Sequence, residues 1–97
     1  MSGNSTPMEH YLNTVKIYLE NGRSSGWSKI TFANYESCLY KFYRFMVDYG
    51  YDEEDPSFTT LLAWKVKLKD EGKTQGTIKQ YLTVLRIFFD WACDQSL

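Results

Sequence analysis

Residues 73–95, KTQGTIKQYLTVLRIFFDWACDQ, form the longest amphipathic segment of this 97-residue chain, and we expect them to decide its fold. Apolar side chains recur in this segment at steps of three and four, which places them on one face of a helix. Thr74 precedes them, and its hydroxyl can accept a hydrogen bond from an unpaired N–H of the first turn. We therefore predict a long, largely buried helix after Thr74. Its apolar positions are Ile78, Tyr81, Leu82, Val84, Leu85, Phe88, Phe89, Trp91 and Ala92.

The opposite side of this predicted helix keeps a polar and partly basic strip. Its members are Gln75, Lys79, Thr83, Arg86 and Asp90. Such a strip is either a solvated face or a surface that contacts a polyanion, because cations and amides are the groups that bind nucleic-acid phosphates and base edges. The periodicity by itself leaves both interpretations open.

Two other segments in the first half of the chain also have helical spacing. The first carries apolar residues from Met8 to Leu19, begins with the capping-box pattern Thr6-Pro7-Met8-Glu9, and is predicted to end near Asn21 with Gly22 in a left-handed turn. The second, between residues 29 and 49, has Ser28 or Thr31 as its candidate cap and stops at Gly50. We predict a helix in each.

A shorter helix is predicted between an acidic run at residues 52–55 and Gly72. Asp55-Pro56 supplies a cap and a first-turn residue, and Phe58, Leu61, Trp64 and Leu68 give it an apolar side. Four helices joined by short turns, without any segment of period two, predict an all-α, compact four-helix domain over residues 7–97. Residues 1–6 are small and polar, and we expect a disordered tail there.

The charges are unevenly distributed along the chain. The formal net charge is −1, which argues against a protein that simply coats nucleic acid. Residues 65–86, however, contain six basic and two acidic residues, so the second half of the chain has a basic side. Most charged residues are exposed for solubility alone, and a solvated face remains the ordinary explanation.

Catalytic and metal-binding patterns are missing from the sequence. His10 is the only histidine and has no partner at ligand spacing, and Cys38 and Cys93 stand far apart. We find no phosphate-binding loop, zinc motif or nucleophile elbow, and no apolar run near the roughly 20 residues that span a bilayer. We therefore expect no metal or cofactor, no enzyme activity for this chain alone, no membrane partner, and reduced thiols in a cytoplasmic protein.

The order and spacing of many core positions resemble a known family. The runs WSKITFANYESCLYKFYRFMVDYG and LLAWKVKLKDEGKTQGTIKQYLTVLRIFFDWA are similar to the N-terminal core-binding domain of tyrosine recombinases, the SAM-like domain of phage integrases. The resemblance covers about residues 9 to 95. The matching residues, in order, are Thr31, Tyr35, Leu39, Phe42, Phe45, Gly50, Gly72, Thr74, Thr77, Ile78, Leu85, Arg86, Phe88, Phe89 and Trp91.

This resemblance implies a compact SAM-like orthogonal bundle that forms half of a clamp on double-stranded DNA at a recombination site. The second and fourth helices of such domains face the DNA. Asn34 and Gln75 are residue types that can pair with an adenine edge, whereas cations and hydroxyls suit phosphate oxygens. Carried onto this sequence, the candidate DNA-binding residues are Lys29, Thr31, Asn34, Lys41, Lys73, Gln75, Thr77, Lys79 and Arg86.

The family resemblance also identifies what this sequence lacks. Relatives carry strand-exchange residues in a C-terminal catalytic domain, which is absent here, so we expect a fragment of a longer integrase that works in DNA integration and recombination. Its expected partners are duplex DNA, the missing catalytic domain and other recombinase protomers. The DNA interpretation requires the polar strips of two helices to form one continuous surface. If Lys41, Lys79 and Arg86 lie on unrelated sides of the molecule, the DNA-binding interpretation fails.

Two alternatives remain open at this stage. A helical protein-interaction module would explain the near-neutral charge and the apolar flank at Val84, Ile87 and Trp91. A helix-turn-helix regulator is less well supported, because the connection before residue 74 does not have the pattern of the tight turn of that motif.

Overall fold

The computed structural model describes residues 9–50 and 58–95, and helices make up most of that part of the chain. They are α1 (Glu9–Ser24), α2 (Lys29–Asp48), α3 (Phe58–Asp70) and α4 (Gln75–Asp94). The described residues contain no strand. The predicted all-α, four-helix class is therefore confirmed. The tail at 1–6, the capping box at 6–9 and the Asp55-Pro56 cap fall wholly or partly outside the described residues.

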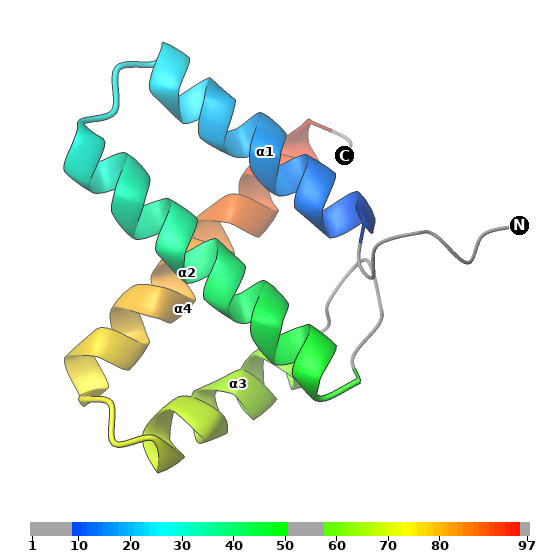
Figure 1. Ribbon diagram of the computed structural model, residues 1–97, viewed down its shortest axis with the longest axis vertical. Coiled ribbons are helices and arrows are strands. Elements are labelled where there is room, and N and C mark those ends of the chain that lie inside the picture. The colour runs from blue at the N-terminus through cyan, green and yellow to red at the C-terminus, as the bar shows by residue number, and fades with distance from the viewer. Residues whose placement is uncertain (1–8, 51–57, 96–97) are drawn as a thin grey trace, which may run out of the picture.

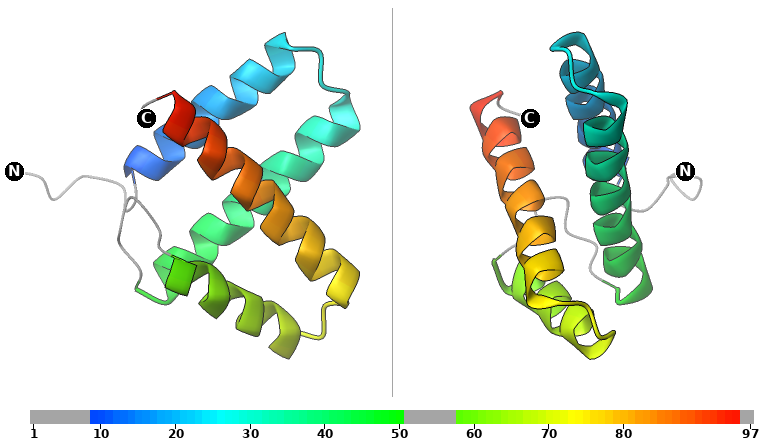
Figure 2. Two further views of the ribbon diagram at one scale, coloured as in Figure 1. Left: turned by 180° about the vertical axis from the view of Figure 1, so that it is seen from behind. Right: turned by 90° about the vertical axis from the view of Figure 1, so that its left-hand side faces the viewer.

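The four helices form two layers. Figure 2 shows α1 and α2 in one layer and α3 and α4 in the other. The two layers meet where α2 crosses α4, near the centre of the molecule (Figure 1). Both of these helices begin on the same side of the molecule and diverge from each other toward that side. The first turns of α2 and α4 therefore lie on the same side of the molecule but apart from each other (Figure 1).

Hydroxyl side chains start both of these helices. Ser28 Oγ accepts a hydrogen bond from Thr31 N at 3.1 Å, and Thr74 Oγ1 accepts one from Thr77 N at 3.2 Å. Thr74 is confirmed as a cap, and Ser28 is the cap of α2. Gly50 and Gly72 follow α2 and α3 with φ of 77° and 83°, the left-handed conformation in which glycine ends a helix.

The predicted end of α1 was wrong. Gly22 lies inside the helix, and Gly26, with φ of 96°, makes the left-handed turn instead. Gly22 serves a packing purpose, because a Cβ atom built there would lie 2.3 Å from the indole ring of Trp27. The connection after α1 therefore folds back, and Trp27 covers the last turn of α1.

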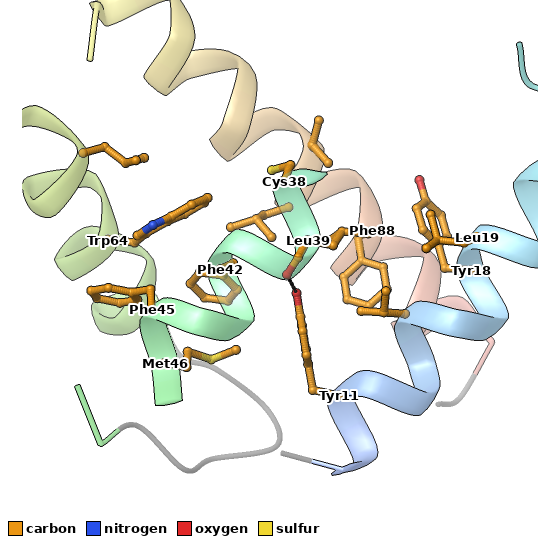
Figure 3. Packing of buried hydrophobic residues seen from close by; sticks show 14 of the residues in the cluster. Tyr11, Tyr18, Leu19, Cys38, Leu39, Phe42, Phe45, Met46, Trp64 and Phe88 are labelled. Carbon is orange, nitrogen blue, oxygen red and sulfur yellow. Dashed lines mark hydrogen bonds between the residues drawn. The ribbon is translucent and has the colours of Figure 1, made fainter. Parts of the chain in front are cut away.

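The hydrophobic core is centred on α2. Leu39, Phe42 and Met46 are fully buried there, and rings from the other three helices surround them (Figure 3). The buried hydroxyl of Tyr11 donates a hydrogen bond to Leu39 O at 2.7 Å, which joins α1 to α2. Burying each such apolar side chain contributes about 1.5–3 kcal/mol. The core therefore supplies most of the folding free energy.

The close crossing of α2 and α4 depends on a small buried residue. Cys38 is 1% exposed, and its Sγ donates to Tyr81 O at 3.5 Å across the crossing. The apolar stripe of α4 is confirmed, since Ile78, Val84 and Leu85 are buried. None of the helices described is long and apolar enough to span a bilayer.

We expect Gly22→Ala to destabilise the domain by about 1–3 kcal/mol, because the added methyl overlaps the Trp27 ring. Gly76→Ala is the matched control. Nothing lies within 4 Å of its added Cβ, so we expect it to be neutral or stabilising by up to about 1 kcal/mol. Urea unfolding followed by circular dichroism measures both. Equal stabilities of the two variants would show that Trp27 does not pack on Gly22.

Candidate nucleic-acid interface

A hollow is lined by residues from the first halves of α2 and α4. Both helices begin on the same side of the molecule (Figure 1). The volume of this hollow is about 470 Å³. Every residue that lines it is uncharged, and most carry a hydroxyl or an amide. We call it the amide hollow. Its lining residues are Thr31, Asn34, Tyr35, Ser37, Cys38, Thr77, Gln80, Tyr81 and Val84.

The two helices present matching residues to this hollow. Each helix has a capped threonine, Thr31 or Thr77, whose backbone N–H bonds to a hydroxyl three residues earlier. An amide follows three positions later, at Asn34 and Gln80. A tyrosine comes directly after each amide, and a buried small or branched residue lies seven positions after each threonine. The same short sequence pattern therefore occurs in α2 and in α4, and both copies supply lining residues of the hollow.

The two tyrosines of this pattern pack against tryptophans. Tyr35 lies 4.8 Å from Trp27 between ring centroids, and Tyr81 stacks almost parallel on Trp64 at 5.6 Å. Aromatic pairs at these distances contribute about 0.5–1.5 kcal/mol beyond simple burial. The backbone next to each amide is thus held by an aromatic contact, whereas the amides themselves are exposed.

Beyond Tyr81 lies a second hollow of about 300 Å³ that is mixed in charge. Lys41 Nζ donates to Tyr81 Oη at 3.2 Å and lies 5.5 Å from the centre of its ring. Lys67 and Glu71 form an ion pair at its edge, which raises the pKa of Lys67 and lowers the pKa of Glu71 through their hydrogen bond. Its charged lining residues are Lys41, Arg44, Asp48, Lys67, Glu71 and Lys73.

A third hollow, of about 450 Å³, lies on the other flank of α4. Its charged lining residues are Lys65 from α3 and Lys79 and Arg86 from α4, and no carboxylate from residues 9–50 or 58–95 lines it. Lys79 and Tyr81 are two positions apart, which corresponds to about 200° around a helix. This cationic hollow therefore faces away from the hollow that contains Lys41.

The predicted site residues divide into groups. Thr31, Asn34 and Thr77 lie together in the amide hollow, and Lys41 and Lys73 line the mixed-charge hollow next to it. Gln75, Lys79 and Arg86 lie together on the opposite flank of α4. Lys29 lines none of these three hollows and is about 140° around α2 from Asn34.

The predicted cations therefore lie on two flanks of α4 and do not form the single continuous surface that we expected from the sequence. In particular, Lys41 lies on one flank, and Lys79 and Arg86 lie on the other. The cause is the position of α2, which packs against only one side of α4. Any DNA-binding interpretation must account for both flanks.

Sequence reasoning missed several of the residues that line these hollows. Gln80 and Tyr81 were assigned to no site, and neither were Ser37, Arg44 and Lys65. A signal for the first two was present, because Thr31-Phe-Ala-Asn-Tyr and Thr77-Ile-Lys-Gln-Tyr share one pattern, each preceded by a hydroxyl three residues earlier. Among the described residues, no cluster of three or more His, Cys, Asp or Glu side chains could hold a metal ion.

The chain is similar to a known protein family. The family model of the phage integrase N-terminal SAM-like domain matches residues 10–96, which is almost the whole chain. No curated protein and no solved structure matches the chain.

The reactivity of the buried Cys38 thiol tests whether α2 and α4 pack closely where they cross. Burial raises the pKa of Cys38 to about 12, although nearby Lys41 lowers it somewhat, so this thiol stays protonated at pH 8. Cys93 is exposed. Because the thiolate is the reactive form, we expect a disulfide reagent at pH 8 to label one thiol quickly in the folded domain and both after unfolding. Rapid labelling that persists in Cys93→Ser would contradict the packed crossing.

Proposed function

The chain belongs to the family of phage integrase N-terminal SAM-like domains, and on this basis we propose that it binds duplex DNA with the first half of α4 in the major groove. The observation that carries this proposal is the arrangement of charge around α4. Cations lie on both flanks of the helix, and the hollow beside its first turns is polar and uncharged.

The size of a helix supports this geometry. An α-helix with its side chains is about 10–12 Å across, and the major groove of B-form DNA is about 12 Å wide. A helix in this groove has one phosphate backbone on each side. Cations on opposite flanks of α4 are therefore expected for a helix that enters the groove, although they would not fit a flat contact.

In this arrangement each flank of α4 binds the phosphate backbone of one DNA strand. Lys41 and Lys73 face one phosphate strand from the mixed-charge hollow, and the hydroxyls of Thr31 and Thr77 lie nearby. Lys79 and Arg86, together with Lys65 of α3, face the other strand. Gln75 lies on the same flank. These contacts fix the position and orientation of the domain on the duplex, which is the usual result of phosphate binding.

In this proposal the domain positions DNA and performs no chemical step. Strand exchange in integration and recombination would belong to a catalytic domain of the kind found in relatives, working with other recombinase protomers. About five phosphate contacts give an affinity that falls steeply with salt, because each contact releases condensed counterions.

The alternative, a protein-interaction module, loses much of its support. Of the three residues that motivated it, Val84 is buried and Trp91 is partly buried, 5.0 Å from Tyr18 between ring centroids. Ile87 is the one that remains exposed, at 41%. Other large apolar residues, among them Ile30 on α2 and Val66 on α3, are also exposed. Apolar residues exposed singly on different helices are common on monomeric proteins and do not indicate an interface.

We expect Lys41→Gln and Lys79→Gln each to weaken binding to a labelled duplex and to reduce the slope of log K against log salt concentration by about 0.9. Both flanks should contribute, because each faces a phosphate strand. Fluorescence anisotropy at several salt concentrations measures the affinity and the slope. Lys16→Gln is the matched control, since Lys16 lies exposed on α1 and lines none of the three hollows.

Two outcomes would overturn this proposal. The first is that the unaltered domain shows no binding at low salt. The second is that only one of the two lysines affects the salt dependence, which would exclude a helix enclosed by both strands. If instead Ile87→Gln abolished self-association and both lysine variants were silent, the interaction module would be the correct function.

A further inference from the structure

The two matched segments of α2 and α4 have a property that phosphate binding does not explain. No charged residue of the described chain lines the amide hollow, whereas lysine and arginine line the cationic hollow and, together with Asp48 and Glu71, the mixed-charge hollow. A surface that bound only phosphates would gain from cations throughout. The region between the mixed-charge hollow and the cationic hollow therefore suits a neutral partner that offers hydrogen bonds.

Base edges in the major groove are such a partner. Asn and Gln can make two hydrogen bonds to adenine, accepting from N6–H and donating to N7, and this pairing distinguishes adenine from the other bases. Asn34 and Gln80 are the amides of the amide hollow, and both side chains are exposed. They come from different helices, so two separate bases could be contacted.

We propose that Asn34 and Gln80 form a pair of adenine-reading side chains, one on each helix, and that the domain prefers duplexes with adenines at two positions. This inference rests on the proposed function, because it needs α4 in the major groove. It replaces Gln75 as the reading amide of α4, since Gln75 lines the cationic hollow on the opposite flank.

The aromatic contacts explain why these two positions suit base recognition. Direct readout needs an amide whose backbone is held in place, because a misplaced amide makes one hydrogen bond where two are needed. Tyr35 and Tyr81 follow the two amides and pack on Trp27 and Trp64. Each amide thus projects from a helix segment that is anchored by an aromatic pair.

Selection from a random duplex library with the unaltered domain gives the preferred sequence. We expect Asn34→Ala and Gln80→Ala each to lose the preference at one adenine, by roughly 5- to 100-fold, with the salt slope unchanged. Asn13→Ala is the matched control and should keep both preferences, because Asn13 is an exposed amide of α1 that lines none of the three hollows. Replacing the adenine read by Gln80 with 7-deazaadenine removes the N7 acceptor, and this should weaken the unaltered domain but not Gln80→Ala.

The outcomes separate this inference from the proposed function. Salt-dependent binding without any enriched sequence, or a preference that survives both alanine substitutions, would overturn adenine reading and leave phosphate binding intact. A failure of the unaltered domain to bind at low salt would overturn both. Circular dichroism of each variant checks that the fold is retained, which is expected because both side chains are exposed.

Discussion

The arrangement of this domain depends on the close crossing of α2 and α4. Cys38 occupies the crossing, and its thiol donates to Tyr81 O, a contact that a larger side chain would prevent. Interiors are packed as densely as organic crystals, so the residue at a helix crossing sets how near the two backbones approach. Because the helices cross at this point, their capped first turns diverge on the same side of the molecule (Figure 1). Residues from the first halves of both helices line the amide hollow.

Much of this fold could be predicted from the sequence, because it follows from local patterns. The apolar stripe of α4 and the cap at Thr74 need only helical spacing and a hydroxyl at the correct position. The conformation of Gly22 could not be predicted in that way. A glycine near a helix end usually adopts a left-handed conformation, but here the ring of Trp27 requires the space that a Cβ would occupy.

The site was harder to predict than the fold, since it depends on how the helices are rotated relative to each other. Periodicity placed Gln75 in the polar strip of α4 and gave no role to Gln80, which lies about 140° around the helix from it. The packing of α2 decides which of the two glutamines lies next to Asn34, because α2 meets α4 on the flank that carries Thr77 and Gln80. The repeated pattern of threonine, amide and tyrosine would have indicated the same choice, since it links these residues to Asn34.

Local charge explains how a chain of net charge −1 can present a surface suited to DNA. Six of the eleven lysines and arginines fall within residues 65–86, whereas four of the twelve acidic residues are concentrated at 52–55. Screening confines charge interactions to about 8 Å at physiological ionic strength, so a phosphate responds to nearby groups more than to the net charge. Around Lys65, Lys79 and Arg86, no carboxylate of the part of the chain that the structure describes lines the hollow. The net charge of a domain is therefore a poor guide to what one side of it can bind, and the distribution of charge around α4 is the more informative quantity.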